Sequence, residues 1–215
     1  MRRIQTRLIF PFLRFFFRHL YTDLAWCYDW VASISSMGQW WSWCRTILPK
    51  LSTGQILELG HGTGRILKEA HDRQHEVYAI DSSRQMSSLA YRRLRRYQHP
   101  QWLARARAQS LPFPNHFFSQ IYTTFPSEFI FDAATLQESH RVLKQGGTLI
   151  IVGVALIRGR SVLDRLSAFL YTITGQTSEP DDDWREPLIQ AGFIPSIERV
   201  ELDRAEVIHF VGKKV

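Results

Sequence analysis

Four residues near position 60 have the types and spacing of a ligand-binding turn. Glu58 lies in a short apolar run, residues 56–59, which predicts a buried strand. Gly60, Gly62 and Gly64 follow at alternate positions. Glycine has no Cβ, so the backbone can turn sharply and a ligand can come close. The apolar spacing that follows predicts a helix, whose N-terminal N–H groups favour a carboxylate or phosphate. The pattern is typical of a nucleotide-binding strand–turn–helix unit.

The acid in this pattern restricts the ligand. The spacing Glu-x-Gly-x-Gly-x-Gly differs from the Gly-x-Gly-x-x-Gly of dinucleotide-binding sites, and the Lys-Ser or Lys-Thr of a P-loop is absent. A carboxylate here would repel a pyrophosphate, but it suits an ammonium group. An ordinary structural turn is the alternative interpretation of the glycines alone. As a binding site, the stretch predicts contacts to an adenosine-type ligand with an amino-acid head and no phosphate, through Glu58, Gly60, His61, Gly62 and Gly64.

A second acid stands where it can complete this site. Asp81 ends the apolar run of residues 76–81, which predicts the next parallel strand, and it lies 17 residues after Gly64. A carboxylate offers two acceptor oxygens side by side and can hold both hydroxyls of a ribose. Ser82 and Ser83 can cap the helix predicted for about residues 84–97. The glycine turn and the acid at the end of the next strand together are a more specific sign of this kind of binding site than either feature alone.

With both acids placed, the residues resemble those of the class I S-adenosylmethionine-dependent methyltransferases, of the small-molecule type similar to the ubiquinone/menaquinone-biosynthesis enzymes. Residues 106–114, Ala-Arg-Ala-Gln-Ser-Leu-Pro-Phe-Pro, are similar to the family's Gly-Asp-Ala-x-x-Leu-Pro-Phe-Pro. Residues 138–147 resemble Glu-x-x-Arg-Val-Leu-Lys-Pro-Gly-Gly, which predicts a helix ended by glycine and then a strand at residues 148–154. Residues 188–193 match Leu-x-x-Ala-Gly-Phe, and the resemblance covers roughly residues 25–215.

The resemblance implies an α/β fold. The expected sheet is Rossmann-like, seven-stranded and mostly parallel, in the order 3-2-1-4-5-7-6, with strand 7 antiparallel and helices on both faces. It also implies S-adenosylmethionine as the cofactor, bound above the C-terminal ends of strands 1, 2 and 4. Further cofactor contacts are expected from Ser82, Met86, Gln109, Ser110, Leu111 and Thr124.

The adenine end departs from the family pattern. Met86 falls where the family often has an apolar residue against the adenine. Arg107 stands where the family's Asp commonly accepts from the adenine amino group, and arginine accepts no hydrogen bond. Gln109 or a backbone carbonyl is the expected substitute. Ser119 also replaces a frequent family Asp.

The methyl acceptor is expected to meet the loop after the fourth predicted strand, near residues 118–126. This loop, Thr-Phe-Pro-Ser-Glu, lacks the Asn/Asp-Pro-Pro-Tyr/Phe of enzymes that modify amide or exocyclic nitrogens, and it lacks a cysteine nucleophile. Phe125, Pro126 and Glu128 are predicted to face the substrate, with Glu128 either a base or a surface carboxylate. Tyr28, in Ala-Trp-Cys-Tyr-Asp, matches a family motif that closes over the cofactor. We assign no catalytic base and no metal ligand.

Composition limits the cellular setting. The chain has 215 residues, a net charge of +7 and two cysteines without a Cys-x-x-Cys partner. This length allows one α/β domain with a substantial core. Two isolated cysteines make neither a disulfide framework nor a zinc site, so we expect a reducing, cytoplasmic compartment.

The N-terminus is basic and rich in phenylalanine. Residues 1–21 hold five arginines and no acid. Arginines interrupt the apolar run, so a membrane span is not expected. An amphipathic segment on an anionic membrane surface and a helix packed on the domain are both consistent with the pattern. We divide the chain into residues 1–50, with amphipathic and cap helices, and a methyltransferase domain at 51–215. That domain carries an apolar lid insert at about 157–183.

The resulting hypothesis is an SN2 methyl transfer to a small lipophilic acceptor, such as a quinone precursor or a lipid head group, at a membrane surface. One alternative is an RNA methyltransferase that uses the basic residues of 92–107. A solvated helix face explains those arginines more simply, so nucleic acid is not the expected partner. The other alternative is a non-catalytic member that acts as an interaction module.

Overall fold

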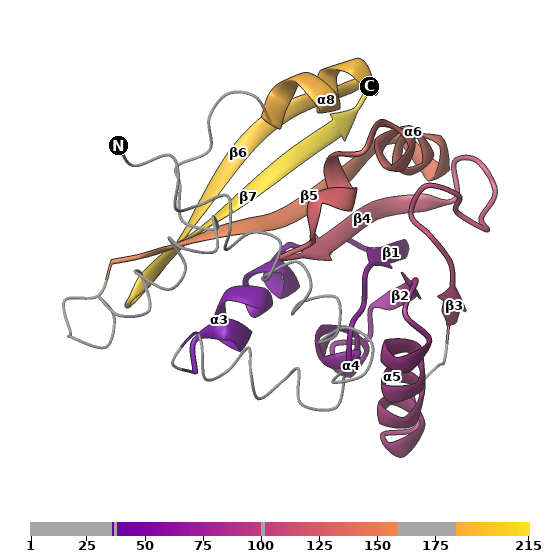
Figure 1. Ribbon diagram of the computed structural model, residues 1–215, viewed down its shortest axis with the longest axis vertical. Coiled ribbons are helices and arrows are strands. Elements are labelled where there is room, and N and C mark those ends of the chain that lie inside the picture. The colour runs from indigo at the N-terminus through magenta and orange to yellow at the C-terminus, as the bar shows by residue number, and fades with distance from the viewer. Residues whose placement is uncertain (1–35, 37, 100–101, 159–183) are drawn as a thin grey trace, which may run out of the picture.

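The computed structural model describes residues 36, 38–99, 102–158 and 184–215. They form one seven-stranded sheet in the order β3-β2-β1-β4-β5-β7-β6, flanked by helices (Figure 1). The strands are β1 (Gln55–Leu59), β2 (Glu76–Asp81), β3 (Leu103–Arg105), β4 (Phe118–Thr124), β5 (Leu143–Ile157), β6 (Phe193–Leu202) and β7 (Ala205–Lys214). The helices are α3 (Trp40–Cys44), α4 (Arg65–Asp72), α5 (Arg84–Arg96), α6 (Ala133–Val142) and α8 (Arg185–Gln190), with short 3-10 helices η2 (Arg45–Lys50) and η3 (Glu128–Phe131).

The sheet confirms the fold that the sequence predicts. Strands β3, β2, β1, β4 and β5 pair in parallel, and β7 runs antiparallel to both β5 and β6. The central strands are buried on both faces, which explains why they read as nearly continuous apolar runs. Their carboxyl ends meet at one edge of the sheet, where open α/β sheets bind ligands.

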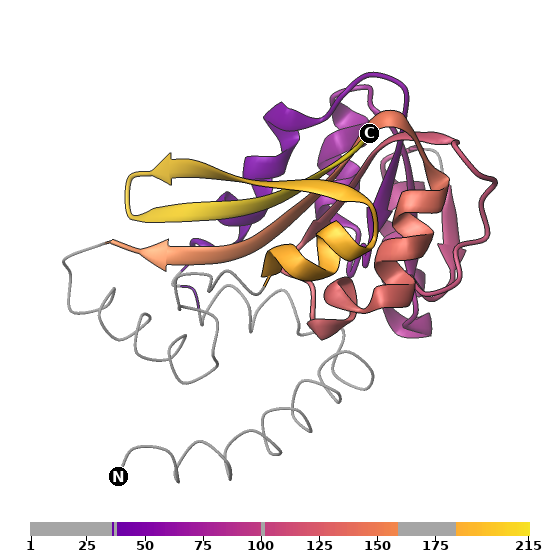
Figure 2. The same cartoon turned by 90° about the horizontal axis from the view of Figure 1, so that it is seen from above.

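Two hydrophobic cores cover the two faces of the sheet. On one face, α3, η2, α4 and α5 pack against alternate residues of the strands. On the other face, η3, α6 and α8 cover the intervening residues. Figures 1 and 2 show α3, α4 and α5 on one side and α6 and α8 on the other. None of the helices within the described ranges is long and apolar enough to cross a membrane.

One helix boundary in the prediction is wrong. Helix α6 does not continue to the glycine pair, because Leu143 is already extended and pairs with Phe118 of β4. Gly146 has a φ of +75° in a bulged start of β5, where the register with β4 shifts between Phe118 and Gln120. Gly146 therefore allows the irregular backbone at the start of this strand and does not end the helix.

Arg141 of α6 ties the 106–114 stretch to the domain. Its guanidinium donates to the carbonyls of Leu111 and Phe113, at 3.0 and 2.9 Å, and to both carboxylate oxygens of Glu138. Glu138 in turn accepts from the Leu111 N–H at 2.7 Å. This network explains why the two family-like motifs, at 106–114 and 138–147, occur together: residues of the second motif hold the backbone of the first in place.

Candidate functional site

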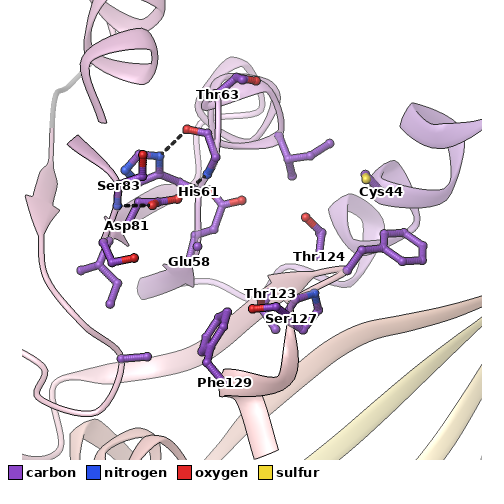
Figure 3. Close-up of a pocket in the computed structure, with 18 of the residues that line it drawn as sticks. Cys44, Glu58, His61, Thr63, Asp81, Ser83, Thr123, Thr124, Ser127 and Phe129 are labelled. Atoms are coloured by element: carbon purple, nitrogen blue, oxygen red, sulfur yellow. Dashed lines mark hydrogen bonds between the residues drawn. The ribbon is translucent and has the colours of Figure 1, made fainter. Parts of the chain in front are cut away.

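A pocket of about 800 Å³ opens at the carboxyl ends of β1, β2 and β4. Its wall is built from α3, the glycine turn after β1, the end of β2, residues 106–109, the end of β4 and the loop beyond it. Figure 3 shows Glu58, Thr124 and Phe129 around the same open space, with Asp81 and His61 at one side and Cys44 at the other. The pocket lies where the sequence predicts a cofactor.

The three glycines of the turn have different tasks. Gly60, Gly62 and Gly64 all have positive φ, at +73°, +51° and +71°. A Cβ on Gly62 would meet no atom within 4 Å, so its backbone faces open space in the pocket. A Cβ on Gly64 would lie 2.7 Å from the Cβ of Ala90. Gly62 thus leaves room for a ligand, whereas Gly64 lets α4 and α5 approach each other.

Asp81 holds the turn in place. One carboxylate oxygen accepts from the Gly62 N–H at 2.9 Å, and the other accepts from the Ser83 N–H at 2.8 Å. Each carboxylate oxygen has about two acceptor sites, so both oxygens can still accept from a ligand hydroxyl. The carboxylate is therefore oriented by the backbone before any ligand binds.

Glu58 is a buried acid on the pocket wall. Its side chain is 1% exposed, and its Oε2 has no hydrogen-bond partner among the described residues. The pKa of this carboxyl is raised to about 8, mainly by burial and to a smaller extent by the charge of Asp81, while the Tyr122 hydroxyl opposes the rise. An unsatisfied buried carboxyl carries a free-energy cost that a bound cation removes. The site therefore fits a cationic ligand group at this position.

His61 is held neutral beside the turn. Its Nδ1 lies 2.9 Å from the Gly62 carbonyl oxygen, which can only accept, so Nδ1 carries the proton. Burial lowers the pKa of the imidazole, although the nearby Asp81 charge opposes this shift. The ring is thus uncharged and adds no positive charge near the cation site.

Aromatic residues form a further part of the pocket wall. Trp40 and Phe125 lie with ring centroids 4.7 Å apart, and Trp41 and Phe129 also line the pocket. Phe125 has a φ of +45°, an unfavourable backbone conformation of the kind that collects at functional sites. No sequence motif marked Trp40 and Trp41, which lie on α3 and are separated from β1 by η2.

A polar pair lies at the edge of the pocket beyond β4. The Gln109 amide donates to an Asp132 carboxylate oxygen at 3.0 Å, and the other oxygen of Asp132 caps α6. Arg107 lines the pocket as an exposed residue. The sequence did not indicate Asp132 as a pocket residue, because an Asp followed by two alanines is typical of a helix N-cap.

Ten of the sixteen predicted site residues line the pocket. They are Glu58, Gly60, His61, Gly62, Asp81, Ser82, Gln109, Thr124, Phe125 and Pro126.

Five others do not line it. Met86 and Leu111 are buried in the core, and Gly64 packs against Ala90. Ser110 closes a tight turn on Arg107. Glu128 lies on η3 and lines a separate hollow of about 340 Å³.

Some predictions fall outside the described residues. Tyr28, the basic segment 1–21 and most of the proposed lid at 157–183 lie there.

Two further residues differ from the sequence expectation. Arg93 was grouped with the exposed arginines, but its guanidinium donates to the carbonyl and the hydroxyl of Thr63, at 2.7 and 2.8 Å. It anchors the glycine turn to α5. The Ser119 hydroxyl donates to the carbonyl of Gln55, at the start of β1 and therefore away from the pocket.

Comparison with known sequences agrees with this geometry. Residues 56–147 match the family model described as "Methyltransferase domain". The chain is 30% identical over 187 residues to the ubiquinone/menaquinone biosynthesis C-methyltransferase UbiE of Coxiella burnetii, covering 81% of this chain and 74% of that protein. A demethylmenaquinone methyltransferase of Tropheryma whipplei is 29% identical over 138 residues, covering 62% of this chain and 57% of that protein.

Solved structures share the fold at low sequence identity. Geranyl diphosphate C-methyltransferase of Streptomyces coelicolor has a TM-score of 0.63 and 12% identity, with 85% of this chain and 82% of that chain covered. Phosphoethanolamine N-methyltransferase 2 of Haemonchus contortus, solved with S-adenosyl-L-methionine, has a TM-score of 0.64 and 17% identity, with 92% and 58% covered. The chain therefore belongs to the class I S-adenosylmethionine-dependent methyltransferases, and it is similar to the ubiquinone/menaquinone-biosynthesis enzymes of that family.

Proposed function

We propose that this pocket binds S-adenosylmethionine with its ammonium group at Glu58 and its ribose at Asp81. The observation that carries the proposal is the buried Glu58 carboxyl with an unsatisfied oxygen, beside a glycine turn that Asp81 orients. Open space over Gly62 leaves room for the methionine end. Asp81 has acceptor capacity left for two hydroxyls.

For the adenine amino group we propose the Gln109–Asp132 pair as the acceptor. The Gln109 amide nitrogen donates to Asp132, which leaves the Gln109 carbonyl oxygen available to accept. Asp132 is an acid that reaches the same pocket from a different element, so it can serve in place of the family's Asp, whose position Arg107 occupies.

The residues of this chain mainly align the reactants and exclude water. When bound, S-adenosylmethionine supplies a methyl group on a sulfonium that is already a good leaving group. Trp40, Phe125 and Phe129 add apolar surface to the pocket that Glu58 lines, which suits a planar or lipophilic acceptor held for in-line attack. A well-oriented acceptor can gain several orders of magnitude in rate from alignment alone.

We propose a small lipophilic acceptor of the quinone-precursor class. The names of the UbiE and demethylmenaquinone relatives point to this class, and the aromatic wall of the pocket is compatible with it. The basic, phenylalanine-rich sequence of residues 1–21 supports delivery of such an acceptor from an anionic membrane surface.

A defined acceptor panel tests the proposal. Purified protein with methyl-labelled cofactor should methylate reduced demethylmenaquinone and leave geranyl diphosphate and phosphoethanolamine unlabelled. With the quinone in anionic vesicles, replacing the five arginines of residues 1–21 with glutamine should lower the rate, whereas the rate in detergent should not change. Labelling of either phosphate compound in preference to the quinone contradicts the acceptor class. Equal rates on vesicles contradict the membrane part.

A further inference from the structure

A tyrosine hydroxyl is buried next to the proposed ammonium site. Glu58 of β1 and Tyr122 of β4 are register partners in the parallel pair, so their side chains stand side by side on one face of the sheet. Tyr122 is 0% exposed. Its hydroxyl lies close enough to Glu58 to lower the pKa of that carboxyl, but neither the hydroxyl nor Glu58 Oε2 makes a hydrogen bond of full geometry to a described residue. Buried polar atoms are nearly always satisfied, and of these two residues Glu58 lines the pocket, so a ligand group there can satisfy the carboxyl while Tyr122 supports it from behind.

Two groups bear on the charge of Glu58, and three more titratable or charged groups lie on the elements around it. Asp81 of β2 is the second acid, and the Tyr122 hydroxyl comes from β4. Burial keeps the Cys44 thiol of α3 protonated by raising its pKa, and His61 of the turn is neutral. Arg65 at the start of α4 is engaged by the Trp41 ring, with its guanidinium carbon 4.4 Å from the ring centroid. These surroundings favour the neutral form of Glu58 until a cation arrives.

We infer that Tyr122 is a positioning residue for the ammonium end of the cofactor, and that the Glu58–Tyr122 pair releases one proton to solvent when that ammonium binds. This inference rests on the proposed function. A tyrosine hydroxyl can rotate, so it accepts from a protonated carboxyl and donates to an ionised one. It can therefore serve both states, and the stronger interaction is the charge-assisted hydrogen bond to the carboxylate in the loaded site.

The proton exchange has a defined sign. In the empty site the pKa of Glu58 is about 8, so the carboxyl is mostly protonated at pH 7. A bound ammonium favours the ionised form and lowers this pKa, and the proton leaves to bulk solvent. Cofactor affinity should therefore rise with pH up to about 8, by at most about tenfold per pH unit, and fall again at higher pH where the amino group of the ligand itself loses its proton.

Isothermal titration calorimetry of the full chain with S-adenosylhomocysteine tests this inference. Titrations in buffers of different ionisation enthalpy should show close to one proton released at pH 7 and about half a proton at pH 8. The probe 5′-methylthioadenosine shares the nucleoside but lacks the amino-acid head, so its binding should release no proton. Glu58→Gln should abolish the proton release.

Tyr122→Phe isolates the role of the hydroxyl, because it keeps the buried ring. It should weaken S-adenosylhomocysteine binding by about tenfold, the scale of one hydrogen bond to a charged group, and leave 5′-methylthioadenosine binding unchanged. Tyr78→Phe, which removes a tyrosine hydroxyl outside the pocket, is the matched control and should bind both ligands as wild type does.

Two results would overturn the inference while the proposed function stands. One is S-adenosylhomocysteine binding by wild type without proton release at pH 7. The other is a Tyr122→Phe variant in which the ratio of the affinities for S-adenosylhomocysteine and 5′-methylthioadenosine is the same as in wild type. If wild type binds neither ligand, the proposed function fails and the inference fails with it.

Discussion

Replacing Asp81 with alanine is expected to weaken S-adenosylhomocysteine binding by about 100-fold or more. The change removes the carboxylate that is proposed to accept from both ribose hydroxyls, and hydrogen bonds to charged groups contribute about 1.5–3 kcal/mol each. It also removes the two acceptors that hold the backbone of the glycine turn, at Gly62 and Ser83. Calorimetry with the purified proteins at pH 8, where protonation of Glu58 limits binding little, gives the ratio of the variant and wild-type dissociation constants directly.

Two further variants make the Asp81 result specific. Asp81→Asn keeps one carbonyl acceptor and should fall between wild type and alanine. Asp72→Ala removes an exposed acid that pairs with Lys68 outside the pocket, and it should bind as wild type does. Thermal unfolding of each variant separates loss of folding from loss of binding. An Asp81→Ala protein that folds and binds with wild-type affinity contradicts the ribose assignment.

The second large effect concerns stability. Gly64→Ala is expected to lower the free energy of unfolding by about 2–5 kcal/mol. A non-glycine residue at a φ of +71° costs about 1–2 kcal/mol, and the new Cβ would overlap the Cβ of Ala90 at 2.7 Å, for which overpacking adds about 1–3 kcal/mol. Denaturant unfolding measures the change.

Gly62→Ala is the matched comparison for Gly64→Ala. It has the same kind of backbone strain, with a φ of +51°, but its Cβ would enter open space in the pocket. It should therefore lose about 1–2 kcal/mol of stability and should weaken cofactor binding. Adding Ala90→Gly to Gly64→Ala removes the opposing methyl group and should recover part of the lost stability. Equal destabilisation by the two single variants, with no recovery in the double variant, contradicts the separate roles of these glycines.

The sheet was predictable because its signals are local. The run of residues 76–81 matches β2 (Glu76–Asp81), and the helix predicted for about 84–97 is α5 (Arg84–Arg96). The end of α6 was not predictable in the same way. Leu143 leaves the helix to pair with Phe118, a choice set by the neighbouring strand and not by the glycines that follow.

The acids of the site were easier to predict than its apolar contacts. Glu58 and Asp81 stand at strand ends, where the topology fixes their direction, and both reach the pocket. Met86 is buried in the core instead. The packing of α5 decides which face of this helix meets a ligand, and the sequence of the helix does not show that packing. Trp40 and Asp132 come from segments far from the glycine turn in sequence. Tertiary packing alone brings them to the pocket.

The central claim is methyl transfer from S-adenosylmethionine to a small lipophilic acceptor. The most direct measurement is incubation of the full chain with methyl-labelled cofactor and a fractionated cell extract. Wild type should place label in the organic-extractable fraction, and Asp81→Ala should place almost none there. Label that enters RNA, or no transfer to any fraction despite cofactor binding, would contradict the account.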